Sequence, residues 1–520
     1  MGDGYLIGLD YGSESARGVL IDATTSQQVA YHVHPYRHGI MTRALPNGRP
    51  LPALGFALQD ASDYIEAAQI ILKTIGEGRE VLGIGIDFTA SSPLPALSDG
   101  RALSQVAPDE PHAYVKLWKH AGAQHYADAI NRGGGSFLDG FGGKVSGEWM
   151  LAKAAQIAAE APEVWSRADR FMEAGDWLVW RLTGHEVRSL DFAAYKAQYT
   201  TGAGYPRNIV DGLAAKLSEP RPVGSPAGSL SSEWRRHTGI KGEAVVAVAV
   251  IDSHVALPAV GAYAPGVLVG ALGTSAAYLL LDSAERELPG GIEGRAYGAA
   301  LPGMWCYEAG QAAFGDVLAW FVRTFPRSND VAENFALYNR DAAALTPRQN
   351  GLLAIDWWNG NRVPYADKSL RGLIAGFDMS TTAADIYRAL MDSICFGARS
   401  IVDRFRSGGI PVERIVLTSG LAKSNPFLLT VMADTLAQTV HVPEIDNPTS
   451  VGAAIHGAVA AEVVADFRDG ADKFGAHHFD VYQPDPTREA VYQKLYQRYD
   501  ELSADETVQK SVRTNNSSLT

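Results

Sequence analysis

Short apolar runs alternate with longer amphipathic stretches along most of the chain, a pattern that predicts an α/β fold. The runs end at small or acidic residues, as strands do where they lead into turns. The expected strands cover residues 5–10, 18–21, 81–87, 245–251, 267–272, 276–281 and 414–418. The expected helices cover residues 61–75, 148–160, 168–182, 315–324, 382–406 and 426–436.

One pattern occurs twice, about half a chain apart. LIGLDYGSESARGVLID at 6–22 and LVGALGTSAAYLLLD at 268–282 both read as strand, Gly-Ser/Thr corner, strand and closing aspartate. A chain of 520 residues is also too long for one ordinary core. We therefore expect two related domains, 1–264 and 265–502, with the boundary near the small-residue stretch 262–266 and a polar, disordered tail at 503–520.

Charge and cysteine content narrow the class of protein. The net charge is −13 and no block of Lys or Arg occurs, which argues against nucleic acid or an acidic membrane surface as the main partner. The two cysteines, Cys306 and Cys395, give no disulfide framework and fit a reducing cytosol. With no basic leader and no long apolar span, a cytoplasmic protein is expected.

The two Gly-Ser/Thr corners are candidate phosphate-binding loops. A tight turn with Gly12 and Ser13 aims several N–H and O–H donors at one point, and Gly273-Thr274-Ser275 offers the same donors from the other half. Asp10 precedes the first corner, and a carboxylate beside phosphates needs Mg²⁺ or its water shell between them. The alternative for each corner is a plain hairpin turn.

A third loop, TSGLAKSN at 418–425, follows an expected strand and precedes an expected helix that begins with a proline. Ser424 or Asn425 suits the N-cap of that helix. A small-residue loop at a helix N-terminus allows the close backbone approach that a purine or phosphate needs, although many α/β loops look alike.

Asp252 ends the nearly pure apolar run 244–251, where ligands of α/β proteins usually bind. A carboxylate there can accept the proton of a substrate hydroxyl during phosphoryl transfer. An N-cap role for Asp252 is the alternative, and the two roles can coexist.

Recognition of a polyol requires several fixed hydrogen-bonding groups in a partly apolar pocket. Candidates at the ends of expected elements are residues 87–90, 116–119 with Trp118, Lys196 and Glu308. No Cys/His spacing indicates a metal site other than the one for Mg²⁺ at Asp10.

Taken together, these segments resemble the FGGY carbohydrate kinases, and within that family they are most similar to the ribulokinases. The segments that carry the resemblance are GLDYGSESARG (8–18), GIDFTAS (85–91), KLWKH (116–120), FGGKVSGEW (141–149), IDSHVALPAVGA (251–262), GALGTS (270–275), YEAGQAAFGD (307–316), IDWWNGNR (355–362) and SVGAAIHGA (450–458). The sequence Leu117-Trp118-Lys119 is similar to the corresponding segment of ribulokinases. It departs from the Trp-x-Asp-x-Arg motif of xylulose and glycerol kinases.

The resemblance implies two ribonuclease-H-like domains around a central cleft, as in actin and hexokinase, with sugar mainly on the first domain and ATP mainly on the second. It implies transfer of the γ-phosphoryl of ATP to the terminal hydroxyl of L-ribulose, a step of arabinose catabolism. The roles that it implies are a catalytic base at Asp252, a Mg²⁺-side acid at Asp10, phosphate or nucleotide contacts at Gly12, Ser13, Arg17, Gly273, Thr274, Ser275, Gly315, Gly420 and Asn425, and sugar contacts at Ala90, Trp118, Lys119, Lys196, Asp252 and Glu308. Ser419 departs from the family, which usually has a glycine there.

Two alternatives remain open on the sequence. One is an FGGY kinase for another pentulose or polyol, such as D-ribulose, xylulose or ribitol. The other is a non-transferring protein, either an actin- or chaperone-like ATPase or a sugar-binding regulator. The expected partners are a small sugar and ATP, with a homodimer as the expected assembly.

Overall fold

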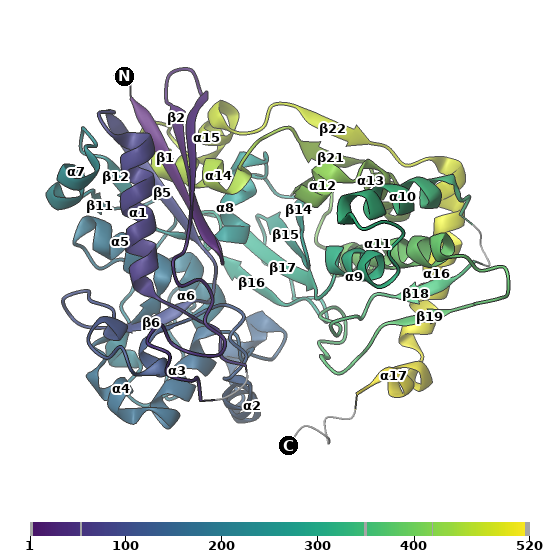
Figure 1. Cartoon of the computed structure of the whole chain (residues 1–520), viewed down its shortest axis with the longest axis horizontal. Coiled ribbons are helices and arrows are strands. Elements are labelled where there is room, and N and C mark those ends of the chain that lie inside the picture. The colour runs from purple at the N-terminus through teal and green to yellow at the C-terminus, as the bar shows by residue number, and fades with distance from the viewer. Residues whose placement is uncertain (1–3, 53–54, 348–350, 419, 515–520) are drawn as a thin grey trace. The chain divides into compact units, whose positions relative to one another are not determined.

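The computed structural model describes residues 4–52, 55–347, 351–418 and 420–514 (Figure 1). The chain forms two units, each built from several segments. The first comprises Met1–Tyr263, Arg295–Cys306 and Ile445–His477, and the second comprises Ala264–Gly294, Tyr307–Glu444 and His478–Thr520.

The first unit is built on a mixed sheet that starts from the N-terminal hairpin. Strand β1 (Tyr5–Tyr11) pairs antiparallel with β2 (Ser15–Asp22) and parallel with β5 (Val81–Phe88). The order is β11-β12-β5-β1-β2-β3, with β13 also paired to β5. Six of the seven residues of β1 are buried, which agrees with its continuous apolar run and with a sheet covered on both faces.

The other elements of the first unit are the remaining strands of this sheet, the helices around it and three short two-stranded sheets. They are β3 (Gln28–Pro35), β4 (Leu58–Gln59), α1 (Ala61–Gly76), β6 (Pro93–Ala96), β7 (Val115–Lys116), α2 (Gln124–Gly133), α3 (Met150–Glu160), α4 (Pro162–Arg167), β8 (Arg170–Glu173), α5 (Ala174–Thr183), β9 (Arg188–Ser189), α6 (Leu190–Ala197), β10 (Pro220–Arg221), β11 (Pro226–Ser229), α7 (Ser232–Thr238), β12 (Val245–Ala247), β13 (Val250–Ile251), α8 (Asp252–Ala259), α14 (Pro448–Ala460) and α15 (Phe467–Phe474).

Helices cover this sheet, and the closest packing is that of α14. Helix α1 packs on β2 and β3, whereas α14 packs on β1, β5 and α8 (Figure 1). Glycines make the α14 contact possible, because a Cβ at Gly8 would lie 1.7 Å from the Ser450 carbonyl oxygen and one at Gly85 would lie 1.7 Å from that of Ala453. The backbone of α14 therefore rests directly on the backbones of two central strands.

The second unit repeats the hairpin. Strand β14 (Val267–Leu272) pairs antiparallel with β15 (Ala276–Asp282) and parallel with β20 (Arg414–Thr418), in a sheet of order β16-β17-β15-β14-β20-β21-β22. The remaining elements in this part of the chain are β16 (Gly294–Tyr297), β17 (Trp305–Gln311), α9 (Gly315–Thr324), α10 (Val331–Ala344), β18 (Leu353–Ile355), β19 (Leu373–Ala375), α11 (Ala383–Ser407), α12 (Gly420–Ser424), α13 (Pro426–Leu436), β21 (Val440–Pro443), β22 (Phe479–Tyr482), α16 (Pro486–Ala504) and α17 (Glu506–Val512).

Both predicted hairpins are present, and most predicted elements lie within a few residues of the observed ones. The helix predicted over 168–182 is wrong in its first part. Residues Arg170–Glu173 form β8, which pairs antiparallel with β6, and α5 begins only at Ala174. A short apolar segment with a distant strand partner looks the same in sequence as the first turn of a buried helix.

The units also differ from the two contiguous domains predicted at 1–264 and 265–502. Segments 295–306 and 445–477, from the second half of the chain, belong to the first unit. The predicted disordered tail at 503–520 differs as well, because its described part ends α16 and forms α17, and the Thr514 N–H donates to the Ser369 carbonyl (3.0 Å).

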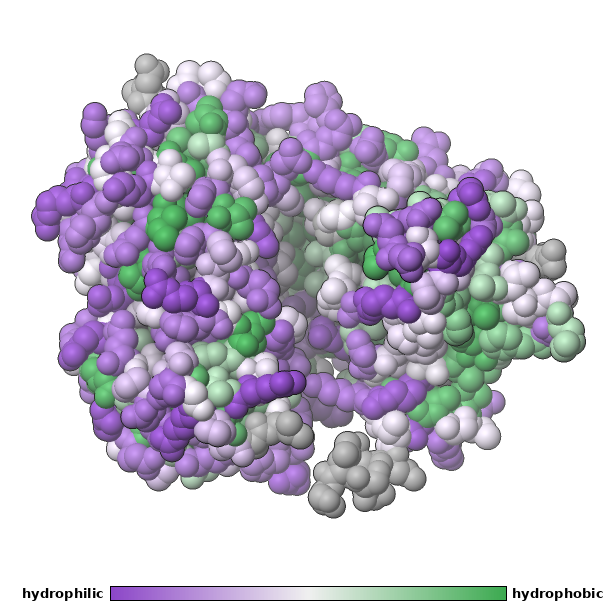
Figure 2. Space-filling view, viewed as in Figure 1, coloured by the Kyte–Doolittle hydropathy of each residue, from purple (hydrophilic) through white to green (hydrophobic). Residues whose placement is uncertain are grey.

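The surface of the first unit agrees with the acidic composition. On the face seen in Figure 2, hydrophilic residues predominate over this unit and hydrophobic ones are scattered among them. Among the helices in the described ranges, none combines the length and the apolar character that crossing a bilayer demands.

Candidate active site

Asp10 lies at the end of β1, where three elements of the first unit meet. Its register partners are Arg17 on β2 and Asp87 on β5. One carboxylate oxygen, Oδ2, accepts hydrogen bonds from Arg17 Nη1 (2.9 Å) and from the hydroxyl of Thr449 in the first turn of α14 (2.7 Å). Asp10 is 4% exposed, so this pairing holds a nearly buried carboxylate in one orientation.

Asp87 is fully buried next to Asp10 across the parallel strand pair. Burial raises the pKa of the Asp87 carboxyl well above its ordinary value, and the neighbouring charges of Asp10 and Asp252 raise it further. Both effects disfavour the ionised form of this carboxyl.

Asp252 is the first residue of α8, directly after β13. The Ser253 N–H donates to its Oδ1 (2.8 Å). The start of the helix is fixed by Asp191 of α6, which accepts the Ile251 N–H (2.9 Å) at Oδ2 and is hydrogen-bonded through Oδ1 to His254 Nδ1 (2.7 Å). Asp191 and His254 are completely buried, so the backbone that carries Asp252 is anchored to the protein interior.

The pKa of Asp252 suits a general base. Burial and the charge of Asp10 raise this pKa to about 6, against the opposing effects of the Ser253 N–H, Lys196 and His254. Lys196, on α6, is 7% exposed, and its Nζ lies 6.0 Å from the ring centroid of Trp149. A carboxylate with a pKa just below neutrality is ionised at neutral pH and still accepts a proton readily.

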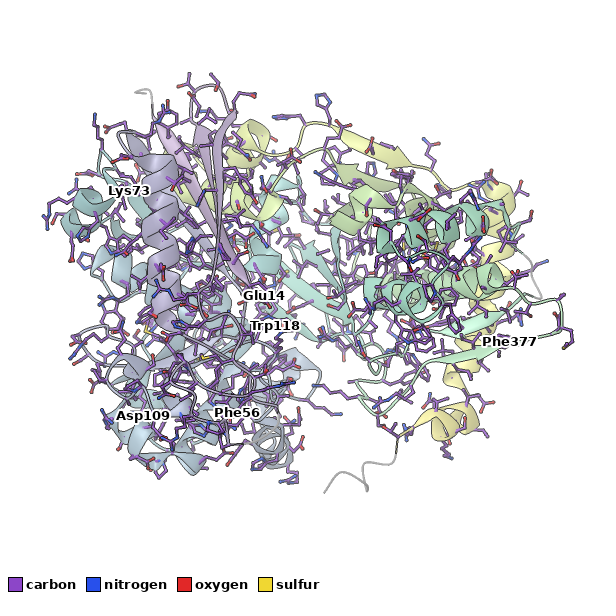
Figure 3. All side chains as sticks on the ribbon, viewed as in Figure 1. Glu14, Phe56, Lys73, Asp109, Trp118 and Phe377 are labelled. Atoms are coloured by element: carbon purple, nitrogen blue, oxygen red, sulfur yellow. The ribbon has the colours of Figure 1, made fainter. Side chains whose placement is uncertain are left out.

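The first Gly-Ser corner contacts the segment that follows β7. The Gly12 N–H donates to the Ser15 carbonyl (3.1 Å), which closes the turn. The Ser13 hydroxyl accepts from Trp118 Nε1 (2.9 Å), and the Ser13 carbonyl accepts from Gln59 Nε2 (2.7 Å). Figure 3 shows Glu14 of this corner beside Trp118. A predicted phosphate residue and a predicted sugar residue are therefore neighbours.

The remaining predicted sugar residues fall in different places. Ala90 is partly buried in the segment between β5 and β6, and Lys119 is exposed next to Trp118. Lys116 is fully buried, with its Nζ 4.7 Å from the ring centroid of Phe56, so it does not present its amine at the surface. Glu308 lies on β17, in the second unit.

The second corner, Gly273-Thr274-Ser275, belongs to a cluster of loops in the second unit. The Gly273 N–H donates to the Ser275 carbonyl (2.9 Å), as Gly12 does to Ser15 in the first hairpin. The Thr274 carbonyl accepts from the Phe314 N–H (2.7 Å), and the Gly273 carbonyl accepts from the Gly315 N–H (2.9 Å). The corner is thereby tied to the start of α9.

Of the other predicted nucleotide residues, Gly315 packs against that corner, whereas Gly420 begins α12 and Asn425 precedes α13. A Cβ at Gly315 would lie 2.7 Å from the Gly273 carbonyl oxygen and 3.1 Å from a methyl carbon of Leu421, so close packing alone requires this glycine. Gly420 has open space on its Cβ side. Asn425 is the N-cap of α13, as predicted, because its Oδ1 accepts the Leu428 N–H (3.1 Å). Residue 419 lies outside the described residues.

Three residues that position the site were not predicted from the sequence. Thr449 contacts Asp10 from 439 positions away, and no local pattern marks such a contact. Asp191 and Lys153 are buried polar residues inside otherwise helical segments. Their signal is a charged residue within an apolar helix face, which indicates a buried partner without identifying it.

The residues at Asp10 fit an indirectly held Mg²⁺. Oδ2 is already occupied by Arg17 and Thr449, which leaves Oδ1 for the ion or one of its waters. Within the described parts of the chain, no cluster of three or more His, Cys, Asp or Glu side chains could form a dedicated metal cage. Mg²⁺ typically needs no such cage, since waters and substrate phosphates supply most of its ligands.

Known proteins share both this fold and much of this sequence. Residues 268–461 match the FGGY family of carbohydrate kinases, C-terminal domain. The ribulokinase of Halalkalibacterium halodurans is 40% identical over 95% of this chain and 93% of its own length, and that of Geobacillus thermodenitrificans is 37% identical over 96% and 94%.

Solved structures give the same fold at lower identity. The xylulose kinase of Rhodospirillum rubrum superposes with a TM-score of 0.84 at 19% identity, covering 96% of this chain and 98% of its own. The gluconate kinase of Lactobacillus acidophilus gives 0.83 at 19% identity, over 98% and 99%. The predicted fold class, two ribonuclease-H-like α/β domains, is confirmed. The chain therefore belongs to the FGGY family of carbohydrate kinases and is an ATP-dependent sugar kinase.

Proposed function

We propose that this kinase transfers the γ-phosphoryl group of ATP to the terminal hydroxyl of L-ribulose, giving L-ribulose 5-phosphate. The choice of sugar is supported by similarity, over nearly the whole chain, to several proteins named ribulokinase. The motif Leu117-Trp118-Lys119, which favours ribulose as the substrate, contacts the first Gly-Ser corner through the Trp118–Ser13 hydrogen bond.

The chemistry is carried by one observation, the environment of Asp252. A carboxylate anchored at the start of α8, with a pKa of about 6, is suited to accept the proton of the attacking hydroxyl. Lys196, a positive charge close enough to act on that pKa, stabilises the ionised form. We assign Asp252 as the general base, with Lys196, Ala90, Trp118, Lys119 and Glu308 as sugar contacts.

We further propose that backbone N–H groups and side-chain hydroxyls bind the nucleotide, in place of the lysine of a Walker A loop. In the second unit, Gly273, Thr274, Ser275, Gly315, Gly420 and Asn425 are the candidate residues. In the first unit, Gly12, Ser13 and Arg17 are candidates for contacts to the transferring phosphate. Fixed N–H groups and a guanidinium beside a phosphoryl group stabilise the charge that develops during transfer.

Mg²⁺ completes the proposal at Asp10. The ion would supply positive charge against the phosphates during transfer. Asp10 would hold it through Oδ1 or a bound water, while Arg17 and Thr449 keep the carboxylate fixed through Oδ2. A homodimer and a cytoplasmic location remain predictions.

The substrate assignment is tested by coupled ADP release over L-ribulose, D-ribulose, D-xylulose, L-xylulose and ribitol, with ATP and Mg²⁺ constant. The proposal requires the highest kcat/KM with L-ribulose and little ADP release without sugar. A higher kcat/KM with another acceptor would assign a sister kinase, and sugar-independent hydrolysis would favour a non-transferring ATPase.

A further inference from the structure

Lys153, on α3, is a fully buried lysine whose Nζ contacts three backbone carbonyls of the first unit. Nζ donates to the carbonyls of Ser91 (2.7 Å), Leu117 (3.0 Å) and Lys116 (3.3 Å). An ammonium group has three N–H donors, so these three acceptors use all of them. The side chain is thus a fixed connector and has no surface from which to contact a ligand.

The three carbonyls belong to two separate segments, and each carries proposed sugar contacts. Ser91 directly follows Ala90, whereas Lys116 and Leu117 directly precede Trp118 and Lys119. A second link joins the same two segments, because the Trp118 N–H donates to the Ser92 hydroxyl (3.2 Å). Lys153 therefore holds together two segments that are not continuous in sequence.

Glu173, at the end of β8, fixes the first of these segments from its other side. Its Oε2 accepts the Ser92 N–H (2.6 Å) and its Oε1 accepts the Ser91 hydroxyl. Glu173 is 2% exposed, so these bonds are protected from water. With one side of the Ala90 segment fixed by Glu173, the contacts to Lys153 and the Trp118–Ser92 hydrogen bond together set how far that segment lies from Trp118.

We propose that Lys153 is a positioning residue of the sugar site, which sets the spacing between Ala90 and the Trp118-Lys119 pair. This inference rests on the proposed function, because it takes those residues as the sugar contacts. It assigns Lys153 no contact with substrate. Removing the ammonium takes a buried donor from the carbonyls of Ser91 and Lys116 and leaves that of Leu117 with the His120 N–H (2.8 Å), so the two segments lose their common anchor.

Lys153→Met tests this role, since methionine fills most of the same volume without a donor. We expect KM for L-ribulose to rise at least about tenfold, the effect of losing one or two buried hydrogen bonds to a charged group. We expect kcat at saturating sugar to change less than about threefold, because an interaction made equally in ground and transition states affects KM alone. Nucleotide affinity, titrated with a non-hydrolysable ATP analogue, should fall by a smaller factor than the sugar KM rises, because Lys153 itself contacts none of the proposed nucleotide residues.

Two further variants make the test specific. Ser92→Ala removes the hydroxyl that accepts the Trp118 N–H, along with its longer contact to the Thr89 hydroxyl (3.4 Å), so it should raise the sugar KM by a smaller factor. Trp234→Phe is the control: it removes a partly buried hydrogen bond from Trp234 Nε1, on α7, to the Arg181 carbonyl on α5 (2.8 Å), and neither helix carries a proposed sugar residue. The sugar KM of this variant should equal that of the wild type.

An unchanged sugar KM in Lys153→Met would overturn the inference, as would equal losses of sugar and nucleotide affinity. If Lys153→Met is not recovered folded, Ser92→Ala decides, and an unchanged sugar KM there overturns the inference as well. Failure of the proposed function is distinguishable, because it would appear in the wild-type enzyme as a preference for another acceptor.

Discussion

At the scale of single residues, the site is governed by three aspartates with different surroundings. Asp10 accepts hydrogen bonds from Arg17 and Thr449, Asp87 is buried against it, and Asp252 begins a helix close to Lys196. Environments of this kind separate the roles of chemically identical groups. Asp252 is the one suited to proton transfer near neutral pH, because its pKa lies at about 6.

The raised pKa of Asp252 predicts the pH dependence of the reaction. Protonation removes the base, so kcat/KM for the sugar should fall about tenfold per pH unit as the pH drops below about 6. An aspartate with the ordinary value of 3.8 would leave the activity flat to about pH 5. The measurement is a pH profile of kcat/KM for L-ribulose at saturating ATP.

Unfolding would be a separate cause of acid inactivation, and the sign of the linkage distinguishes it. Because the folded-state pKa of Asp252 is raised, the folded protein binds the extra proton between pH 3.8 and about 6. Through Asp252 alone, the free energy of unfolding therefore rises as the pH falls through this window. A profile that stays flat to pH 5, with the protein folded throughout, would contradict the assignment of the base.

At the scale of elements, helix α14 is the most constrained contact of the first unit. Its backbone lies on β1 and β5 at positions where only glycine fits, and its first turn brings Thr449 to Asp10. The fit of this helix therefore connects the packing of the core to the orientation of a proposed site residue.

Gly85→Ala measures how strict that packing is. The new Cβ would meet the Ala453 carbonyl oxygen at 1.7 Å, so strand and helix must separate, at a cost of about 3 kcal/mol or more in the free energy of unfolding. Gly133→Ala is the matched control, since a Cβ at this position of α2 has no heavy atom within 4 Å, and it should change that free energy by less than about 1 kcal/mol. Chemical denaturation followed by circular dichroism compares them, and equal midpoints for the two variants would contradict this account.

Elements with a strong local signal were predictable from the sequence. The hairpins β1–β2 and β14–β15 have apolar strands and glycine corners, and α13 has a proline after its Asn425 cap. Strand β8 was not predictable, because its partner β6 lies more than seventy positions earlier and its four residues carry no turn signal before α5.

At the scale of the whole molecule, the chain consists of two units. Each unit is built on its own mixed sheet, and each sheet contains an antiparallel hairpin with a glycine corner. The repeated pattern in the sequence indicated the duplication. It could not indicate that residues 295–306 and 445–477 belong to the first unit, because membership depends on contacts between distant segments. The same limit hid Thr449, whereas Asp10, Arg17 and Asp252 were named from local patterns or family resemblance.

This division puts the proposed base and most of the proposed nucleotide residues in different units, while Gly12, Ser13 and Arg17 lie in the unit of the base. Asp252 belongs to the first unit, and the proposed nucleotide loops at Gly273, Gly315 and Gly420 belong to the second. A change confined to Asp252 should therefore affect proton transfer without affecting nucleotide binding.

The most direct test is the steady-state rate of Asp252→Asn with L-ribulose, measured together with its affinity for an ATP analogue. Asparagine keeps an oxygen for the Ser253 N–H, so the start of α8 is preserved while the base is lost. The account predicts that kcat falls about 10²- to 10⁴-fold while nucleotide affinity stays at the wild-type value. Turnover near that of the wild type would contradict the claim that Asp252 deprotonates the sugar.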